Sequence, residues 1–143
     1  MTAPIHDAFV VTLRCPYPVA QVLDRLETLV RAHGLTVFAR IEFSRDADAA
    51  GLSMPPTAQL VFGSPSAGTP VMTAVPTAAL ELPLRVVAWT DPSGQCWLSF
   101  KEPRALVSAY GVPESLILPL EGIHALCQSA IGVPSDGDIG RTG

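Results

Sequence analysis

The residues best placed to do chemistry lie in one short stretch, Gly63-Ser64-Pro65-Ser66-Ala67-Gly68-Thr69-Pro70. Thr69-Pro70 is typical of a helix start, because proline has no N–H group to leave unpaired at the first helical position. A glycine-containing loop that leads into a helix presents free N–H groups and the positive end of the helix dipole. The stretch therefore predicts a concave site for a small anion or carbonyl group, next to a short helix from about Pro70 to Ala74.

The spacing of Gly63 and Gly68 imitates a phosphate-binding P-loop but lacks its chemistry. A P-loop continues with lysine and then serine or threonine, whereas this chain continues with Thr69 and Pro70. The cation that would contact the β- and γ-phosphates is missing, and Pro65 removes a further amide donor. Nucleoside triphosphate binding is therefore disfavoured, and ordinary turn structure stays the alternative to a ligand site.

The predicted ligand site combines hydroxyl groups, backbone amides and one cation. Arg85 is the only charged residue on an otherwise apolar predicted strand, so it could supply the missing countercharge. The alternative is that Arg85 lies at the sheet edge or reaches a carboxylate such as Glu81. No catalytic residue is predicted, since neither Thr57 nor Thr69 has a general base near it in the sequence. The predicted site residues are Thr57, Gly63, Ser64, Ser66, Gly68, Thr69 and Arg85.

The other reactive side chains indicate no cofactor or metal. Glu121, His124 and Cys127 follow one another at intervals of three, and each such step drifts about 60° around a helix, which spreads the three side chains. Cys15, Cys96 and Cys127 are odd in number and show no C-x-x-C spacing, and no signal peptide is recognised. This pattern predicts buried, reduced thiols and a cytoplasmic protein.

Composition narrows the classes of partner. The chain has 143 residues, of which 48% are hydrophobic, and a formal net charge of −4. Its nine cationic residues are scattered, which disfavours nucleic acid. No apolar run approaches the roughly 20 residues of a membrane span, so no membrane association is predicted. We expect one domain over residues 1–132 and a disordered tail over 133–143.

The clearest predicted element is a helix from Pro18 to His33. Apolar residues recur on one face at intervals of three and four, and Gly34 follows as a typical terminating glycine. Strands are predicted over 8–14, 35–43, 60–62, 82–89 and 96–100, the last two joined by the turn Asp91-Pro92-Ser93-Gly94. Short helices are predicted over 45–50, 77–80 and 102–110. A further helix is predicted from Pro113 to about Ile131, interrupted near Pro119.

These elements predict an α+β fold of two layers. A curved antiparallel or mixed sheet is expected to be covered on one face by the first and last helices. Trp89, Trp97 and Phe38 are candidates for the uncovered face, which would then be a dimer interface or the floor of a ligand site.

The same motifs resemble the domain of unknown function 302 family. The resemblance is carried by Gly51-Leu52, the 55–70 stretch, the run from Pro76 to Trp89, Gly94 and Trp97-Leu98-Ser99, and it covers roughly Phe9 to Cys127. It implies a single α+β domain, a tendency to pair and no established activity. Three polar family positions are changed: Phe43 replaces histidine, Gly63-Ser64-Pro65-Ser66 replaces Gly-Asn-Pro-Lys, and Phe100-Lys101 replaces Tyr-Asn.

Three functions stay open at this point. The favoured hypothesis is a non-catalytic module that binds a small anionic or apolar ligand, as a homodimer. The second is an enzyme with a degenerate active site in the same cleft, since the histidine position of the family is Phe43. The third is a purely structural homo-oligomer.

Overall fold

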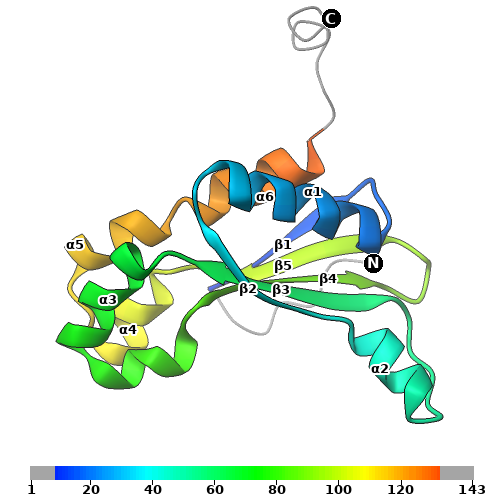
Figure 1. Ribbon diagram of the computed structural model, residues 1–143, viewed down its shortest axis with the longest axis horizontal. Coiled ribbons are helices and arrows are strands. Elements are labelled where there is room, and N and C mark those ends of the chain that lie inside the picture. Colours follow the sequence, from blue (N-terminus) through cyan, green and yellow to red (C-terminus); the bar gives the residue numbers. More distant parts are fainter. Residues whose placement is uncertain (1–8, 133–143) are drawn as a thin grey trace, which may run out of the picture.

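The computed structural model describes residues 9–132 and has an α+β architecture (Figure 1). The predicted tail over 133–143 lies outside the described residues, and the single-domain assignment stays a prediction. The strands are β1 (Val10–Cys15), β2 (Thr36–Ile41), β3 (Thr57–Gly63), β4 (Leu84–Thr90) and β5 (Cys96–Lys101). The α-helices are α1 (Val19–Ala32), α2 (Phe43–Ala49), α3 (Pro65–Ala74), α4 (Ala105–Tyr110), α5 (Glu114–Ile117) and α6 (Ile123–Ile131), and the 3₁₀ helices are η1 (Pro76–Glu81) and η2 (Leu118–Leu120).

The five strands form one sheet in the order β1-β5-β4-β3-β2, and every neighbouring pair is antiparallel. Helices α1 and α6 lie side by side over one face of this sheet (Figure 1). The main core fills the space between them, with fully buried side chains such as Leu26 and Val30 of α1, Phe62 of β3 and Leu98 of β5. The predicted fold class and the covering helices are confirmed, and β4 is the central strand of the sheet.

Helix α1 follows the predicted pattern closely. Its buried residues, Val19, Val22, Leu23, Leu26 and Val30, recur at intervals of three and four and form one continuous face. The helix ends before Gly34, which has φ +75, a left-handed conformation that glycine adopts without steric cost. On the solvent side of α1, Asp24 forms a salt bridge of 2.7 Å with Arg40 of β2. This ion pair links the helix to the edge strand of the sheet.

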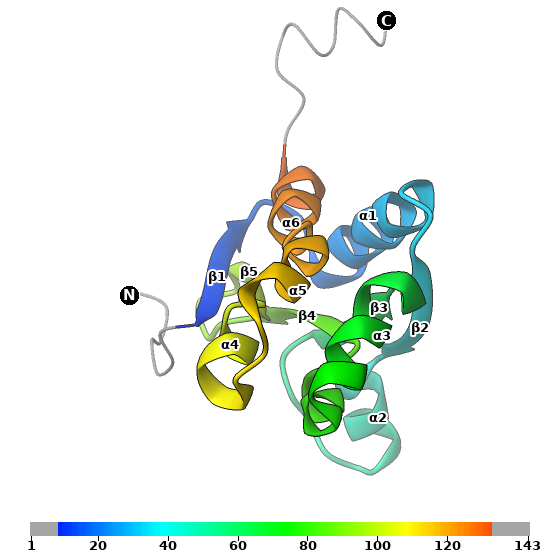
Figure 2. The ribbon, with the colours of Figure 1, turned by 90° about the vertical axis from the view of Figure 1, so that its left-hand side faces the viewer.

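A second, smaller core was not predicted. Helices α3, η1, α4, α5 and η2 gather at one end of the sheet instead of covering its face (Figure 2). Fully buried Val71 of α3 packs there with Val112, just before α5, and with Ile117 of α5. These segments are short and individually weak in periodicity, so only their mutual packing defines the cluster. The complete set of its buried residues is Val71, Ala78, Leu82, Leu106, Val112, Ile117 and Leu120.

The alternate residues of β2 do not all share one face, as they would in a regular strand. A β-bulge between Val37 and Ala39 shifts the pairing, so that Val37 lies opposite Phe62 on the core side and Ala39 lies opposite Val61 on the other. An extra residue in one strand moves every later side chain to the opposite face. The strand also ends earlier than predicted, since Phe43 is the first residue of α2.

No helix among the described residues covers the central part of the other face. Ala88 and Leu98 point into the core, so their neighbours Trp89 and Trp97 lie on the uncovered face, where their rings stack with centroids 6.2 Å apart. Both indole N–H groups are satisfied: Trp89 donates to Ser99 Oγ and Trp97 to Asp91 Oδ2, each at 2.9 Å. The two tryptophans are therefore confirmed on this face, as predicted.

Asp91 organises the β4–β5 turn. Its Oδ1 accepts hydrogen bonds from the Ser93 hydroxyl at 2.6 Å and from the backbone N–H groups of Ser93 and Gln95, and its Oδ2 accepts the Trp97 N–H. The hydrogen bond from Ser93, followed by that from Trp97, lowers the pKa of Asp91 to about 2. The ionised carboxylate is therefore the form that the folded turn holds.

This shift predicts acid sensitivity of the turn. Because the folded pKa lies below the ordinary value of 3.8, ionised Asp91 stabilises the fold above about pH 4, and this contribution is lost as pH falls toward 2. The melting temperature should fall over that range, and the Asp91→Asn variant should show a smaller fall. Thermal unfolding between pH 5 and 2 measures both; equal falls in the two proteins would contradict the assignment.

Candidate functional site

The predicted loop after β3 is helical. Helix α3 begins at Pro65 with Ser64 as its N-cap residue, so Thr69 and Pro70 lie inside the helix and do not start it. Both Ser64-Pro65 and Thr69-Pro70 fit a cap followed by proline at the first helical position. The earlier of the two signals is the one that the fold uses, and the predicted start at Pro70 is wrong.

This correction removes most of the predicted anion cradle. Pro65 has no N–H group, and the N–H groups of Ala67 and Gly68 both donate to the Ser64 carbonyl oxygen, at 3.0 and 2.9 Å. The side chains of Ser64 and Ser66 bond to each other at 2.7 Å. Few donors at this end of the helix are therefore left to meet an anion.

A cavity of about 210 Å³, here called the α3 groove, lies beside this helix. Phe38 of β2 forms one wall and Met72 of α3 another, while Gly63 and Gly68 leave the space open because neither carries a side chain. No ionisable side chain lines the groove. Its complete lining is Phe38, Gly63, Ser64, Pro65, Gly68, Thr69, Met72, Leu82, Pro83, Leu84 and Leu120.

Four of the seven predicted site residues, Gly63, Ser64, Gly68 and Thr69, line the α3 groove together. Ser66 lies in the first turn of the same helix and contacts Ser64. Thr57 is at the opposite end of β3, roughly 20 Å away along the strand, where it donates to the Pro55 carbonyl oxygen. Arg85 lines a different cavity. The structure therefore divides the predicted site in three.

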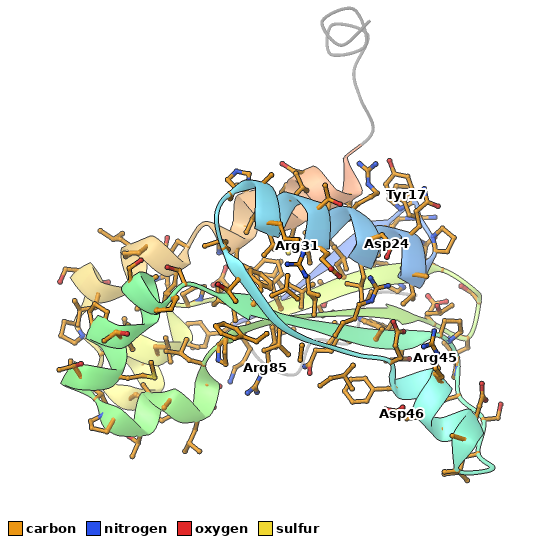
Figure 3. All side chains as sticks on the ribbon, in the orientation of Figure 1. Tyr17, Asp24, Arg31, Arg45, Asp46 and Arg85 are labelled. Atoms are coloured by element: carbon orange, nitrogen blue, oxygen red, sulfur yellow. The ribbon has the colours of Figure 1, made fainter. Side chains whose placement is uncertain are left out.

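Arg85 extends from the uncovered face, on the side of the sheet opposite the helix that carries Asp24 and Arg31 (Figure 3). It lines a cavity of about 300 Å³, here called the Arg85 cavity, whose polar lining is Gln59, Glu81, Arg85, Ser99, Lys101 and Glu102. Among residues 9–132, the Arg85 guanidinium has no hydrogen bond or ion pair. The predicted alternative partner, Glu81, accepts a hydrogen bond from Lys101 at 3.2 Å, and the charge of Arg85 also contributes to lowering the pKa of Glu81.

Glu81 is the most connected acid of the Arg85 cavity. The hydrogen bond from Lys101 lowers the pKa of Glu81, and the Tyr110 hydroxyl, which donates to Glu81 Oε2 at 3.1 Å, lowers it further against the opposing effect of burial. Desolvation and the bond to Glu81 raise the pKa of Tyr110. Glu81 is thus held as a carboxylate and Tyr110 as a neutral phenol, which is the reverse of a poised acid–base pair.

Sequence reasoning missed the apolar walls of the α3 groove. Phe38 forms one of them: its ring lies 3.7 Å from the position that a Cβ on Gly63 would occupy, on the side of the sheet away from the core-facing Phe62. Phe38 is also the extra residue of the β-bulge in β2, and no sequence pattern marks the bulge. Among the described residues, no three His, Cys, Asp or Glu side chains gather closely enough to hold a metal ion.

These observations define a class: a small α+β domain with an open antiparallel sheet, two helices over one face and an uncharged groove at the sheet end. The chain belongs to the family described as "Domain of unknown function DUF302", which matches residues 11–128. A crystal structure of an uncharacterized conserved DUF302 protein from Bacillus stearothermophilus has the same fold. Its TM-score is 0.71 at 17% identity, over 87% of this chain and 97% of that one.

Sequence relatives include longer proteins. The chain is 36% identical over 110 residues to proteins named fluoride-specific ion channel FluC 1 from Brucella suis and Brucella abortus. It is equally similar to one named FluC 2 from Brucella melitensis. The match covers 77% of this chain but spans only 41–43% of the length of these relatives. No helix within residues 9–132 is long and apolar enough to cross a membrane.

Proposed function

We propose that the protein is a non-catalytic module that binds a small, neutral, largely apolar molecule in the α3 groove. The single observation that carries this proposal is the composition of the groove. Its walls come from four separate parts of the chain, and none of the lining side chains is ionisable. Apolar walls with a few hydroxyl groups are typical of small-molecule sites.

The lining supports a neutral ligand over an anion. A carboxylate or phosphate placed there would lose hydration without gaining a cation, and burying an unpaired charge costs several kcal/mol. The hydroxyl groups of Ser64 and Thr69 could form one or two hydrogen bonds with a polar end of the ligand and so orient it. Each 100 Å² of apolar surface removed from water contributes roughly 2.5 kcal/mol.

The same lining argues against the enzyme hypothesis at this position. A reaction needs a nucleophile, acid or base in reach of the substrate. Serine and threonine hydroxyls are the only reactive groups in the α3 groove, and Ser64 bonds to Ser66 and not to a base.

Nuclear magnetic resonance titration with indole tests the proposal. The amide signals of Gly63 and Gly68 should shift and saturate with a dissociation constant of about 1 mM, while those of Gly51 and Gly94, turn glycines toward the other end of β3 and β4, should not. Indole-3-carboxylate should bind at least about tenfold more weakly, because the groove offers no cation. Equal affinity for the two molecules, or no shift at Gly63 and Gly68, would refute a neutral site there.

A second candidate function is supported by Arg85, whose guanidinium makes no hydrogen bond with the described residues. The relatives from Brucella are named for fluoride, and the Arg85 cavity is lined by the cations Arg85 and Lys101 together with the acids Glu81 and Glu102. We propose as the alternative that a small inorganic anion binds there, displacing the Lys101–Glu81 contact.

Arg85→Ala should then remove the response to anions. Fluoride or phosphate, added against chloride at constant ionic strength, should raise the melting temperature of the unsubstituted chain, since a ligand at 100 times its dissociation constant stabilises by about 2.7 kcal/mol. Arg85→Ala should lose this rise, and Arg45→Ala, which removes an exposed arginine on α2 (Figure 3), should keep it. A rise of the same size in Arg85→Ala would exclude the cavity.

Two further properties stay proposals. Pairing into a homodimer is supported by the family resemblance and by the uncovered tryptophan face of the sheet, and a purely structural oligomer would use the same face. A cytoplasmic location is supported by the three thiols, all of them free and buried.

A further inference from the structure

Two cysteines meet at one end of the sheet. Cys15 is the last residue of β1 and Cys96 the first of β5, and the antiparallel register places them directly opposite each other. Both are free thiols. Gln95 bridges this point, because its side-chain amide donates to the carbonyl oxygens of Cys15 and Cys96 at 2.9 and 2.8 Å. The two strands are therefore firmly held where the two sulfur atoms lie.

The register suits a disulfide. Residues directly opposite each other in an antiparallel pair have Cα atoms about 4.5 or 5.5 Å apart, and a disulfide requires roughly 4.4–6.8 Å. The bond can form without separating or sliding the strands. We infer that Cys15 and Cys96 are a modification site, a dithiol that a peroxide or a small disulfide converts reversibly to a cross-strand disulfide.

A small oxidant has a narrow route to the sulfur atoms of Cys15 and Cys96. Cys15 and Cys96 are 2% and 6% exposed, and both line an open depression of about 910 Å³ that also includes Tyr17 and Gly94. Cys127 is the internal comparison, since it is fully buried in the main core and lines none of the cavities described above. A small oxidant can therefore reach the pair and not Cys127.

The chemistry is balanced with hydrogen peroxide as oxidant. One cysteine thiolate attacks an O–O oxygen, which forms a sulfenic acid and releases hydroxide; the second sulfur then displaces hydroxide from the sulfenic acid to form the S–S bond. Two thiols lose two electrons and two protons, and one peroxide becomes two waters. Burial and the neighbouring Cys15 raise the pKa of Cys96 to about 12. We therefore assign the first attack to Cys15, whose sulfur accepts the Tyr17 N–H at 3.4 Å.

A disulfide between Cys15 and Cys96 would fix the edge strand β1 to its neighbour β5. β1 pairs only with β5 within the described sheet, and α1 begins four residues after Cys15. Linking Cys15 to Cys96 closes a long loop that includes β2, β3 and β4. Closing such a loop restricts the unfolded chain, so the oxidised protein should melt about 10 °C higher than the reduced one.

Mass spectrometry of the full chain tests the inference. The native protein is treated with hydrogen peroxide, denatured and alkylated. We expect a loss of 2 Da, one alkylated cysteine at Cys127, and tryptic peptides 15–25 and 86–101 joined, all reversed by dithiothreitol together with the rise in melting temperature. Three alkylated cysteines, or oxygen added to single cysteines without a link, would overturn it. The unsubstituted chain gives the decisive result, and Cys96→Ala, if folded, should abolish the link while Cys127→Ala retains it.

Discussion

Leucine at position 68 is expected to abolish indole binding in the α3 groove while the fold stays intact. A Cβ on Gly68 would lie 3.7 Å from Met72 Cε and 3.9 Å from Leu82 Cδ1, both ordinary contacts with the groove walls. The remaining carbons of leucine would then occupy space that the ligand needs. Leucine also favours helix over glycine by about 1 kcal/mol, so α3 should not be weakened. Binding should fall more than about tenfold.

The matched control is Ala74→Leu, which adds the same bulk to the exposed last residue of α3. It should leave the indole titration unchanged. If Gly68→Leu binds indole as well as the unsubstituted chain does, the ligand does not occupy the α3 groove. A loss of binding in both variants would point to a general effect on the helix.

Alanine at position 62 is expected to give the largest loss of stability, about 3–5 kcal/mol. Phe62 is fully buried in the main core, near the end of β3, where it pairs with Val37 and Leu84. Truncating it leaves a cavity that the surrounding strands cannot collapse to fill. Urea unfolding monitored by circular dichroism measures the change in the free energy of unfolding.

Phe38 provides the comparison within the same part of the sheet. It is 51% exposed and lines the α3 groove, so Phe38→Ala should cost about 1 kcal/mol or less. The ring contributes apolar contact area to the ligand, and losing roughly 50 Å² of it should weaken indole binding about tenfold. A large stability loss in Phe38→Ala with unchanged binding would reverse the roles assigned to these two phenylalanines.

The sequence predicts best where a local signal and the tertiary fold agree. α1 combines strict apolar periodicity with a terminating glycine, and the β4–β5 hairpin follows from Asp91-Pro92-Ser93-Gly94, so both elements are recovered. The interruption near Pro119 is recovered as well, because proline cannot continue the ladder of helix hydrogen bonds.

The structure is predicted least well where two helix-start signals compete or where a strand irregularity sets which face a side chain occupies. Ser64-Pro65 and Thr69-Pro70 are equivalent helix starts, and only the longer helix packs Ala67 against the second core. That choice removes the anion cradle and replaces it with an apolar groove. The β-bulge in β2 likewise has no mark in the residue pattern, yet it reverses the faces of the residues that follow Phe38. The candidate site was thus located in part, while its chemistry was not.

Native mass spectrometry of the protein purified from its own cells is the sharpest test of a ligand in the α3 groove. It reports retained small molecules and the number of subunits together. We expect one neutral molecule per chain in the unsubstituted protein, absent from Gly68→Leu and retained in Ala74→Leu, with chains in pairs if the homodimer forms. The same molecule retained by Gly68→Leu, or a bare chain that also fails to bind indole, would contradict a ligand site in the α3 groove.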